Sequence, residues 1–475
     1  MSERVFCIDF GASYTKVALR TAPQEASALV PYFGRDLWAP TVVAVDWSSG
    51  KPKPDISFGE TASGMKPSGK TTIFTNFKRD LFAPPPADKP GPHPLDALLQ
   101  SEEFEALAAK YNVLPASVAG LRTLVGSARA VLGVPADRGV SVEARRQDDA
   151  KKVTAHFFRW LHDRVMESCE KLPHTALNYR DIPLRVSVPV LGSASDLEQH
   201  PGCQRLREAL ALTGWKLDDR LFVPEPESNA VGVLTKATNA LTRKKQIDFG
   251  EMFNKGPLIT VMKGDPHHTT YRALVIDVGA FTTDFSSLLL TTDGKYVVLT
   301  QGGWFDTVQR SIPLGVNDLD ASVKATLPET KRAALDGLSR RDFSAFQDAA
   351  YTEAKGYRVA GLGVIGGEAD RDAVQAGLDG FAKKLADETA TFCQQLGAAS
   401  KQELILTGGG CNIPAVRDAL IAAVGQMPGN PAVKTHAPGL KKAKAGPPVD
   451  SLDEHFARGG SALGGASVYF EKAYN

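Results

Sequence analysis

The chain has 475 residues, more than one hydrophobic core normally serves, so two or more domains are expected. Hydrophobic residues make up 43% of the sequence and charged residues 23%, which is the composition of a water-soluble globular protein. A formal net charge of +1 excludes a strong overall basic field of the kind that attracts nucleic acid or an anionic membrane.

The cysteines and the apolar runs indicate the cellular compartment in which the protein is expected to work. The five cysteines lie far apart and form no C-x-x-C pair, so neither a disulfide framework nor a zinc site is predicted. The N-terminal MSERVFCIDFG is too short for a signal peptide, and no uncharged apolar run approaches the roughly 18 residues of a membrane span. A cytoplasmic protein that binds neither nucleic acid nor a membrane is expected.

Strands and helices alternate along the chain, which indicates an α/β architecture. In the N-terminal half, the predicted strands lie at 4–20 (a strand, a tight turn and a second strand), 41–46, 56–60, 183–190 and the start of 220–235. The predicted helices lie at 95–111, 115–132, 146–171, 203–215 (ended by Gly214) and the end of 220–235. A proline-rich loop is predicted at 83–94, because proline neither donates to a strand ladder nor continues a helix.

In the C-terminal half, residues 236–270 predict an inserted polar loop, followed by a second strand-turn-strand unit at 273–290. The stretch VVLTQGGWFDTVQRSI (297–312) predicts a strand that turns at two glycines into a helix. The later predictions are a mostly helical segment at 318–384, a strand, glycine turn and helix at 403–420, a loop at 438–448, and a small-residue helix at 456–472 that packs closely on a neighbour.

Two hairpin turns carry the same Asp-x-Gly signal, at Asp9-Phe10-Gly11 and Asp277-Val278-Gly279, each followed by threonine and more strand. The glycine lets a ligand approach the backbone, and the amides of the turn can form an anion nest. The aspartate would then bind Mg²⁺ through water, because magnesium keeps several of its waters. A single Asp-x-Gly turn can be explained as an ordinary polar β-turn. Two such turns in one chain instead favour two related half-domains, whose phosphate-facing hairpins share one metal.

Three further segments are candidates, each with a plainer explanation beside it. The glycines of LTGGGCN (406–412) leave space for a flat group or a phosphate at a helix N-terminus, although a tight strand-to-helix turn explains them alone. Glu225 precedes a proline that holds it extended, so its side chain can point into a cleft, whereas capping explains Glu227. Lys78 lies between two aromatic residues, where a snorkelling surface lysine is the alternative.

The order of these segments resembles the actin-like ATPase superfamily, most closely the nucleotide-binding domain of DnaK-type heat-shock chaperones. The similar stretches, spread over about residues 4 to 470, are the two hairpins, TIFTNFKRDLF, FVPEPESNAVGV, QGGWFDTVQRSI, YTEAKGYR, LTGGGCN and SALGGASVYF. The resemblance implies two lobes, each a mixed sheet flanked by helices, with a deep cleft for ATP between them. The implied division is lobe I at 1–236 (core 1–40 and 147–236, peripheral subdomain about 41–146) and lobe II at 237–475 (core about 271–306 and 385–475, peripheral subdomain about 307–384).

The resemblance also implies roles for individual residues. Asp9, Asp277 and Glu225 would hold Mg²⁺ through water. Lys78 would reach the γ-phosphate and orient the attacking water, and Thr282 would hydrogen-bond near that phosphate. The positions expected to line the nucleotide are Gly11, Ser13, Thr15, Lys16, Gly279, Gly302, Gly303, Lys355 (near the adenine), Gly408, Gly409 and Gly410. Asp284 is expected to be structural.

The sequence also departs from the chaperone pattern. Lys16 in the first hairpin is more similar to actin and its bacterial relatives. Ala280-Phe281 makes the second turn bulkier, and Cys411-Asn412 stands where chaperones place an arginine that stacks on adenine. The chain ends where the chaperone ATPase domain ends, so a peptide-binding domain is not expected.

The expected function is a stand-alone DnaK-like ATPase that binds ATP or ADP with Mg²⁺, hydrolyses ATP slowly, and uses lobe closure as a switch for a protein partner. The inserts at 83–146 and 236–270 offer surface for that partner. The alternatives are an actin-like filament-forming ATPase, a small-molecule kinase of the same superfamily, and a nucleotide-binding scaffold without turnover.

Overall fold

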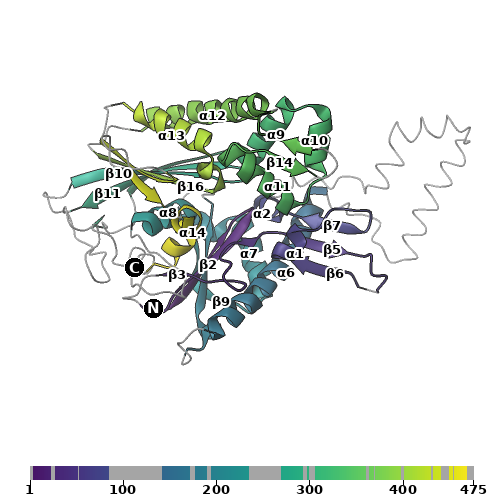
Figure 1. Cartoon of the computed structure of the whole chain (residues 1–475). Coiled ribbons are helices and arrows are strands. Elements are labelled where there is room, and N and C mark those ends of the chain that lie inside the picture. Colours follow the sequence, from purple (N-terminus) through teal and green to yellow (C-terminus); the bar gives the residue numbers. More distant parts are fainter. Residues whose placement is uncertain are drawn as a thin grey trace, which may run out of the picture.

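The computed structural model describes residues 4–22, 27–51, 53–84, 142–171, 177–189, 194–234, 269–292, 297–298, 305–359, 363–368, 370–396, 401–428, 432–439, 449–452 and 454–467. Mixed sheets flanked by helices confirm the expected α/β class (Figure 1). The expected helices at 95–111 and 115–132, and nearly all of the loops at 236–270 and 438–448, lie outside the described residues. Among the helices that are described, none is both long and apolar enough to cross a membrane.

The first large sheet is centred on the N-terminal hairpin. Its strand order is β3-β2-β1-β8-β9, and β4 also pairs with β2. Strands β1 and β2 form the expected antiparallel hairpin, whereas β8 and β9 run parallel to β1. The bounds are β1 Val5–Phe10, β2 Tyr14–Arg20, β3 Ala28–Leu29, β4 Ala39–Pro40, β8 Pro183–Val188 and β9 Lys216–Pro224. Every residue of β1 is buried, as expected for a central strand with both faces covered.

The second large sheet repeats this arrangement around the second hairpin. Its order is β12-β11-β10-β16-β17-β18, with β13 also on β11. Strands β10 and β11 are antiparallel, and β16 and β17 continue parallel to β10 on its other side. The bounds are β10 Thr269–Val278, β11 Thr283–Thr292, β12 Val297–Val298, β13 Phe305–Ile312, β16 Lys401–Thr407, β17 Ala432–Pro438 and β18 Val449–Leu452. The two sheets therefore share one topology around β1 and β10.

The prediction of a helix at the end of 297–312 is wrong, because Phe305–Ile312 is strand β13. It pairs antiparallel with β11, where it satisfies backbone groups that a sheet edge leaves open. Its phenylalanine, threonine, valine and isoleucine suit a strand. A second strand pair, β14 Tyr357–Val359 and β15 Gly363–Ile365, interrupts the segment predicted to be mostly helical.

The remaining elements surround the two sheets. Hydrophobic residues between positions 6 and 222 form one core cluster, and those between 274 and 437 form another. A small sheet of β5 Val43–Asp46, β6 Asp55–Phe58 and β7 Thr71–Phe74 lies beside the first (Figure 1). The helical elements are α1 Gly59–Ser63, α2 Phe77–Phe82, α6 Val142–Glu170, α7 Pro201–Ala211, α9 Val316–Thr326, α10 Glu329–Asp336, α11 Arg340–Gln347, the π-helical turn Asp348–Thr352, α12 Arg371–Gln394 and α13 Pro414–Gly425.

Two helices, α8 (Glu225–Leu234) and α14 (Glu454–Gly465), lie between the large sheets (Figure 1). Their backbones nearly touch. A Cβ at Gly232 would lie 2.1 Å from the carbonyl oxygen of Gly460, and one at Gly464 would lie 1.8 Å from that of Ser228. The prediction of a closely packed small-residue helix is confirmed. Helix α14 also contacts β1, β2 and β8, and α8 contacts β10 and β11, so the pair joins both sheets.

Gly214 has a different role from the one expected. Helix α7 ends at Ala211, before Gly214 is reached. A Cβ at Gly214 would lie 2.5 Å from Cε1 of the buried His162 on α6. The glycine is needed there because the chain passes directly over the imidazole ring.

Candidate functional site

The first hairpin places a lysine opposite an aspartate. The register of β1 and β2 aligns Asp9 with Lys16, and the lysine Nζ lies 2.9 Å from Asp9 Oδ2. A Cβ at Gly11 would lie 2.2 Å from the carbonyl oxygen of Tyr14, so the turn requires glycine. Behind the turn, the hydroxyls of Thr15 and Thr41 lie 2.9 Å apart.

Thr41 ties these groups to the turn itself. Its hydroxyl donates to the carbonyl of Gly11 at 2.7 Å, and its amide donates to that of Ser13 at 2.9 Å. The hydroxyl of Thr15 therefore supports the turn from behind through Thr41. Among the polar residues expected to line the nucleotide in this hairpin, Lys16 contacts the carboxylate of Asp9.

The second hairpin is closed by its own backbone. The amide of Gly279 donates to the carbonyl of Thr282 at 2.9 Å, and the Thr282 hydroxyl donates to Asp284 Oδ2 at 3.1 Å. The register of β10 and β11 places Asp284 directly opposite Asp277. The expected structural role of Asp284 fits these contacts, but its carboxylate also lies within electrostatic range of Asp277 and Lys78.

The bulky Ala280-Phe281 turn is anchored from outside. The first amides of α9, those of Val316 and Asn317, donate to the carbonyls of Gly279 and Ala280 at 2.9 Å each. The guanidinium of Arg79 on α2 lies 5.5 Å from the centroid of the Phe281 ring, within cation–π range. The turn that departs from the chaperone pattern is therefore held by α9 and α2.

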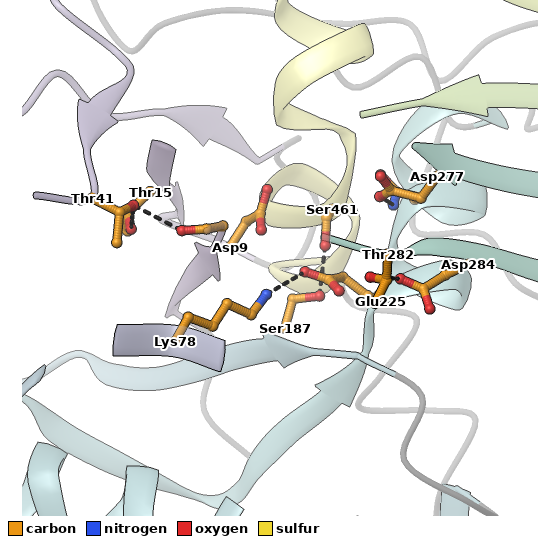
Figure 2. A network of polar contacts seen from close by, with 12 residues as sticks. Asp9, Thr15, Thr41, Lys78, Ser187, Glu225, Asp277, Thr282, Asp284 and Ser461 are labelled. Carbon is orange, nitrogen blue, oxygen red and sulfur yellow. Dashed lines mark hydrogen bonds and ion pairs between the residues drawn. The ribbon is translucent and has the colours of Figure 1, made fainter. Parts of the chain in front are cut away.

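Lys78 and Glu225 form an ion pair between α2 and the start of α8. Lys78 Nζ lies 3.4 Å from Glu225 Oε1 and 5.8 Å from the centroid of the Phe10 ring. Only 12% of the lysine side chain and 15% of the glutamate side chain are exposed. Lys78 is thus not a snorkelling surface lysine. Figure 2 shows Lys78 and Asp9 facing Glu225 and Asp277.

The charges of this cluster do not balance. Burial raises the pKa of Glu225 to about 8, even though Lys78 lowers it. Burial raises the pKa of Asp277 to about 6, with added repulsion from Asp284 and Asp9. Burial also raises the pKa of Asp284. Burial acts to lower the pKa of Lys78, but the neighbouring carboxylates, Glu225 first, outweigh it and raise that pKa. More negative charge is gathered here than the nearby lysines neutralise.

One residue of the cluster was missed by sequence reasoning. Asn229 donates from Nδ2 to Asp277 Oδ2 at 3.1 Å. It follows Glu225 by four positions on α8, and this spacing places both side chains on one face of a helix. The only signal in the sequence was this spacing, and it does not identify the partner.

The glycine turn after β16 serves the end of β10. Gly408 has φ +84°, and a Cβ there would lie 2.3 Å from Asp277 Oδ1. A Cβ at Gly410 would lie 2.3 Å from Val278 Cγ1, whereas one at Gly409 would meet nothing within 4 Å. Packing against β10 therefore explains two of the three glycines, and Gly409 borders open space. Nearby, the partly buried Asn412 donates to the carbonyl of Gly409 at 3.4 Å.

Another expected contributor, Lys355, stands apart from this cluster. Lys355 follows the π-helical turn that ends at Thr352, in a segment before β14, and is not part of a helix. Its largely exposed ammonium pairs with Glu353 at 2.8 Å. Gly302 and Gly303 lie outside the described residues.

The cluster fits a hydrated cation better than a directly bound one. Throughout the described part of the chain, no three histidine, cysteine, aspartate or glutamate side chains are arranged to hold a metal ion directly. Asp9, Asp277 and Glu225 nevertheless gather in a buried region with excess negative charge. Mg²⁺ keeps several waters and is commonly held by one or two carboxylates together with substrate phosphates. This donor set fits that mode of binding.

Comparison with known proteins adds no family. The sequence matches no protein-family model and no curated protein. The fold and the side chains gathered between the two sheets are therefore the features that indicate a function.

Proposed function

We propose that this protein is a Mg²⁺-dependent ATP hydrolase with the two-lobed fold of the actin-like superfamily, similar to the nucleotide-binding domain of DnaK-type chaperones. One observation carries the proposal. Two Asp-x-Gly hairpins occupy equivalent positions in two sheets of the same topology. Their aspartates, Asp9 and Asp277, lie within electrostatic range of each other and of the Lys78–Glu225 pair.

The proposed roles follow from charge and position. Asp9, Asp277 and Glu225 would hold Mg²⁺ through water, and the bound ion would neutralise phosphate charge. Lys78 would present its ammonium to the γ-phosphate, and Glu225 keeps that ammonium charged and in place. Lys78 would also orient the attacking water, and Thr282, whose hydroxyl donates to Asp284, would hydrogen-bond near the γ-phosphate. Phosphoryl transfer needs little else, because positioning and charge neutralisation dominate its catalysis.

A nucleotide held between two sheets can act as a switch, because its contacts favour the closed arrangement over an open one. We therefore propose that slow hydrolysis controls the binding of a protein partner. We also infer a reducing compartment such as the cytoplasm, because the five cysteines are buried and lie far apart in the sequence with no C-x-x-C pair.

The test is ATP hydrolysis by purified protein and by two variants, Lys78→Ala and Asp277→Ala. We expect slow, Mg²⁺-dependent phosphate release that falls about 10²- to 10³-fold in each variant, as when one preorganised charge-stabilising group is removed. Lys51→Ala is the matched control, because this exposed lysine forms a surface i,i+4 ion pair with the exposed Asp55. Normal hydrolysis in folded Lys78→Ala and Asp277→Ala would show that the site assignment is wrong.

The same samples separate the alternatives. Light scattering that rises on addition of ATP would identify the filament-forming function. Phosphate transferred to a small metabolite, with a phosphorylated product, would identify a kinase. Tight nucleotide binding with no phosphate release would identify a scaffold without turnover.

A further inference from the structure

Asn229 connects the two sheets at the candidate site. It lies on α8, which directly follows β9 of the first sheet, and only 3% of it is exposed. Its Nδ2 donates to Oδ2 of Asp277, which lies near the end of β10 in the second sheet. The bond therefore joins an element of one sheet to the proposed metal-site carboxylate of the other.

The orientation of the Asn229 amide is determined on both sides. An ionised carboxylate only accepts hydrogen bonds, so the amide nitrogen must face Asp277. The amide oxygen faces α14, where a Cβ at Gly460 would lie 3.1 Å from Asn229 Oδ1. The side chain is thus held between α14 and β10 with its donor directed at Asp277.

Both oxygens of Asp277 are constrained. Oδ2 accepts from Asn229, and Oδ1 occupies the space that a side chain at position 408 would need. The Gly408 backbone and the Asn229 amide therefore hold the carboxylate between them. Rotation of the Asp277 side chain would either break the hydrogen bond or bring Oδ1 against the glycine turn.

We propose that Asn229 is a positioning residue of the nucleotide–magnesium site, holding the Asp277 carboxylate in the orientation in which it meets the hydrated ion. This role rests on the function proposed above. Polar groups that orient metal-binding carboxylates contribute about 10- to 100-fold to metal affinity or activity. A residue that only fastened α8 to β10 would affect folding and would not affect metal-dependent binding selectively.

The test uses Asn229→Leu, which keeps a similar volume and removes the donor. The affinity for a fluorescent ADP analogue is measured with Mg²⁺ and again with EDTA. We expect binding in EDTA to remain as in the wild type, and the gain in affinity on adding Mg²⁺ to shrink about 10-fold or more. In steady-state hydrolysis, kcat should fall about 10- to 100-fold while the KM for ATP changes little.

Ser228→Ala is the matched control. Ser228 is the neighbouring residue on α8, is fully buried, and its hydroxyl has no hydrogen-bond partner among the described residues. This variant should bind ADP and respond to Mg²⁺ as the wild type does. If leucine prevents folding, as judged by circular dichroism, Asn229→Ala removes the same donor without adding volume.

The outcomes are distinct. Equal weakening of ADP binding with and without Mg²⁺, or wild-type behaviour in both conditions, would overturn the positioning role and leave the proposed ATPase intact. A folded wild-type protein that binds no ADP in either condition would overturn the proposed function and this role with it.

Discussion

At the scale of single residues, the main feature is the burial of acidic groups that the nearby lysines do not fully neutralise. The pKa of Glu225 is raised to about 8 and that of Asp277 to about 6, burial being the first cause of each. Such a cluster lowers the stability of the protein without a ligand, and a bound cation would relieve the repulsion. Under the proposed function, this loss of stability is the expected exchange of stability for activity.

The pH dependence of stability follows from these shifts. The pKa of Asp277 in the folded protein lies above its ordinary value of 3.8, so the folded state holds a proton that the unfolded state has released. The free energy of unfolding therefore falls as the pH rises from about 4 to about 6, and above that range the loss is complete.

Asp277→Asn should remove this loss. In EDTA without nucleotide, we expect its Tm to match the wild type near pH 4 and to exceed it by about 3 °C at pH 7.5. A pKa raised from 3.8 to about 6 corresponds to roughly 3 kcal/mol, and a chain of 475 residues shifts by about 1 °C per kcal/mol. Thermal unfolding followed by circular dichroism measures the difference. The exposed Asp149→Asn on α6 is the control and should follow the wild-type curve. A variant less stable than the wild type at pH 7.5 would contradict the raised pKa.

At the scale of elements, the crossing of α8 and α14 determines how the site is assembled. Helix α8 carries both Glu225 and Asn229, and its position depends on backbone contact with α14 at Gly232 and Gly464. The hydroxyls of Ser187 on β8 and Ser461 on α14 lie 2.5 Å apart beside this crossing (Figure 2). A change in the spacing of the two helices would therefore displace two site residues at once.

Gly464→Ala tests this crossing. A Cβ there would lie 1.8 Å from a backbone oxygen, so the helices must separate. We expect a loss of about 1–3 kcal/mol in the free energy of unfolding, the usual cost of overpacking, measured by urea denaturation. Gly425→Ala is the control at the end of α13, where a Cβ meets nothing within 4 Å, and it should change stability by less than about 0.5 kcal/mol. Equal stability of the two variants would be evidence against the close crossing.

At the scale of the whole molecule, several contacts join the parts built on the two sheets. Helix α11 contacts α1, and the guanidinium of Arg341 on α11 would lie 3.7 Å from a Cβ at Gly64. Burial raises the pKa of Glu60 on α1, and the positive charge of Arg341 opposes that rise. Arg79, on α2 beside the first sheet, contacts the ring of Phe281 in the turn between β10 and β11 of the second sheet. A ligand bound between the sheets would therefore stabilise elements of both.

ADP with Mg²⁺ should raise the Tm of the whole protein. A ligand at 100 times its Kd contributes about 2.7 kcal/mol when it binds only the folded state. Differential scanning calorimetry should show all of the unfolding move to higher temperature, with a smaller shift in EDTA. Two transitions of which only one moves would show that the site belongs to one sheet alone. No shift at millimolar ADP and Mg²⁺ would contradict the proposed function.

Much of the fold follows from local patterns. The hairpins β1–β2 and β10–β11 were predicted because their strands and turns are adjacent in sequence, and α6 because its apolar residues recur at helical spacing. Strand β13 was not predicted, because it forms by pairing with β11, which is not adjacent in the sequence. That pairing overrides the local preference for a helix. The partner of Asn229 could not be predicted for the same reason.

The sequence by itself determined the α/β class, the two Asp-x-Gly hairpins and the glycine turn after β16, because each depends on hydrogen bonds and glycine geometry within a few residues. The resemblance implied that Asp9, Lys78, Glu225 and Asp277 would share a site, but only the tertiary structure shows that they form one cluster and that Asn229 and Gly408 hold Asp277. Those contacts join segments from about 50 to nearly 270 positions apart. They arise from the burial of α8 and α14 between two sheets, and the hydrophobic effect that drives such burial is non-directional, so no local pattern encodes which polar groups will meet.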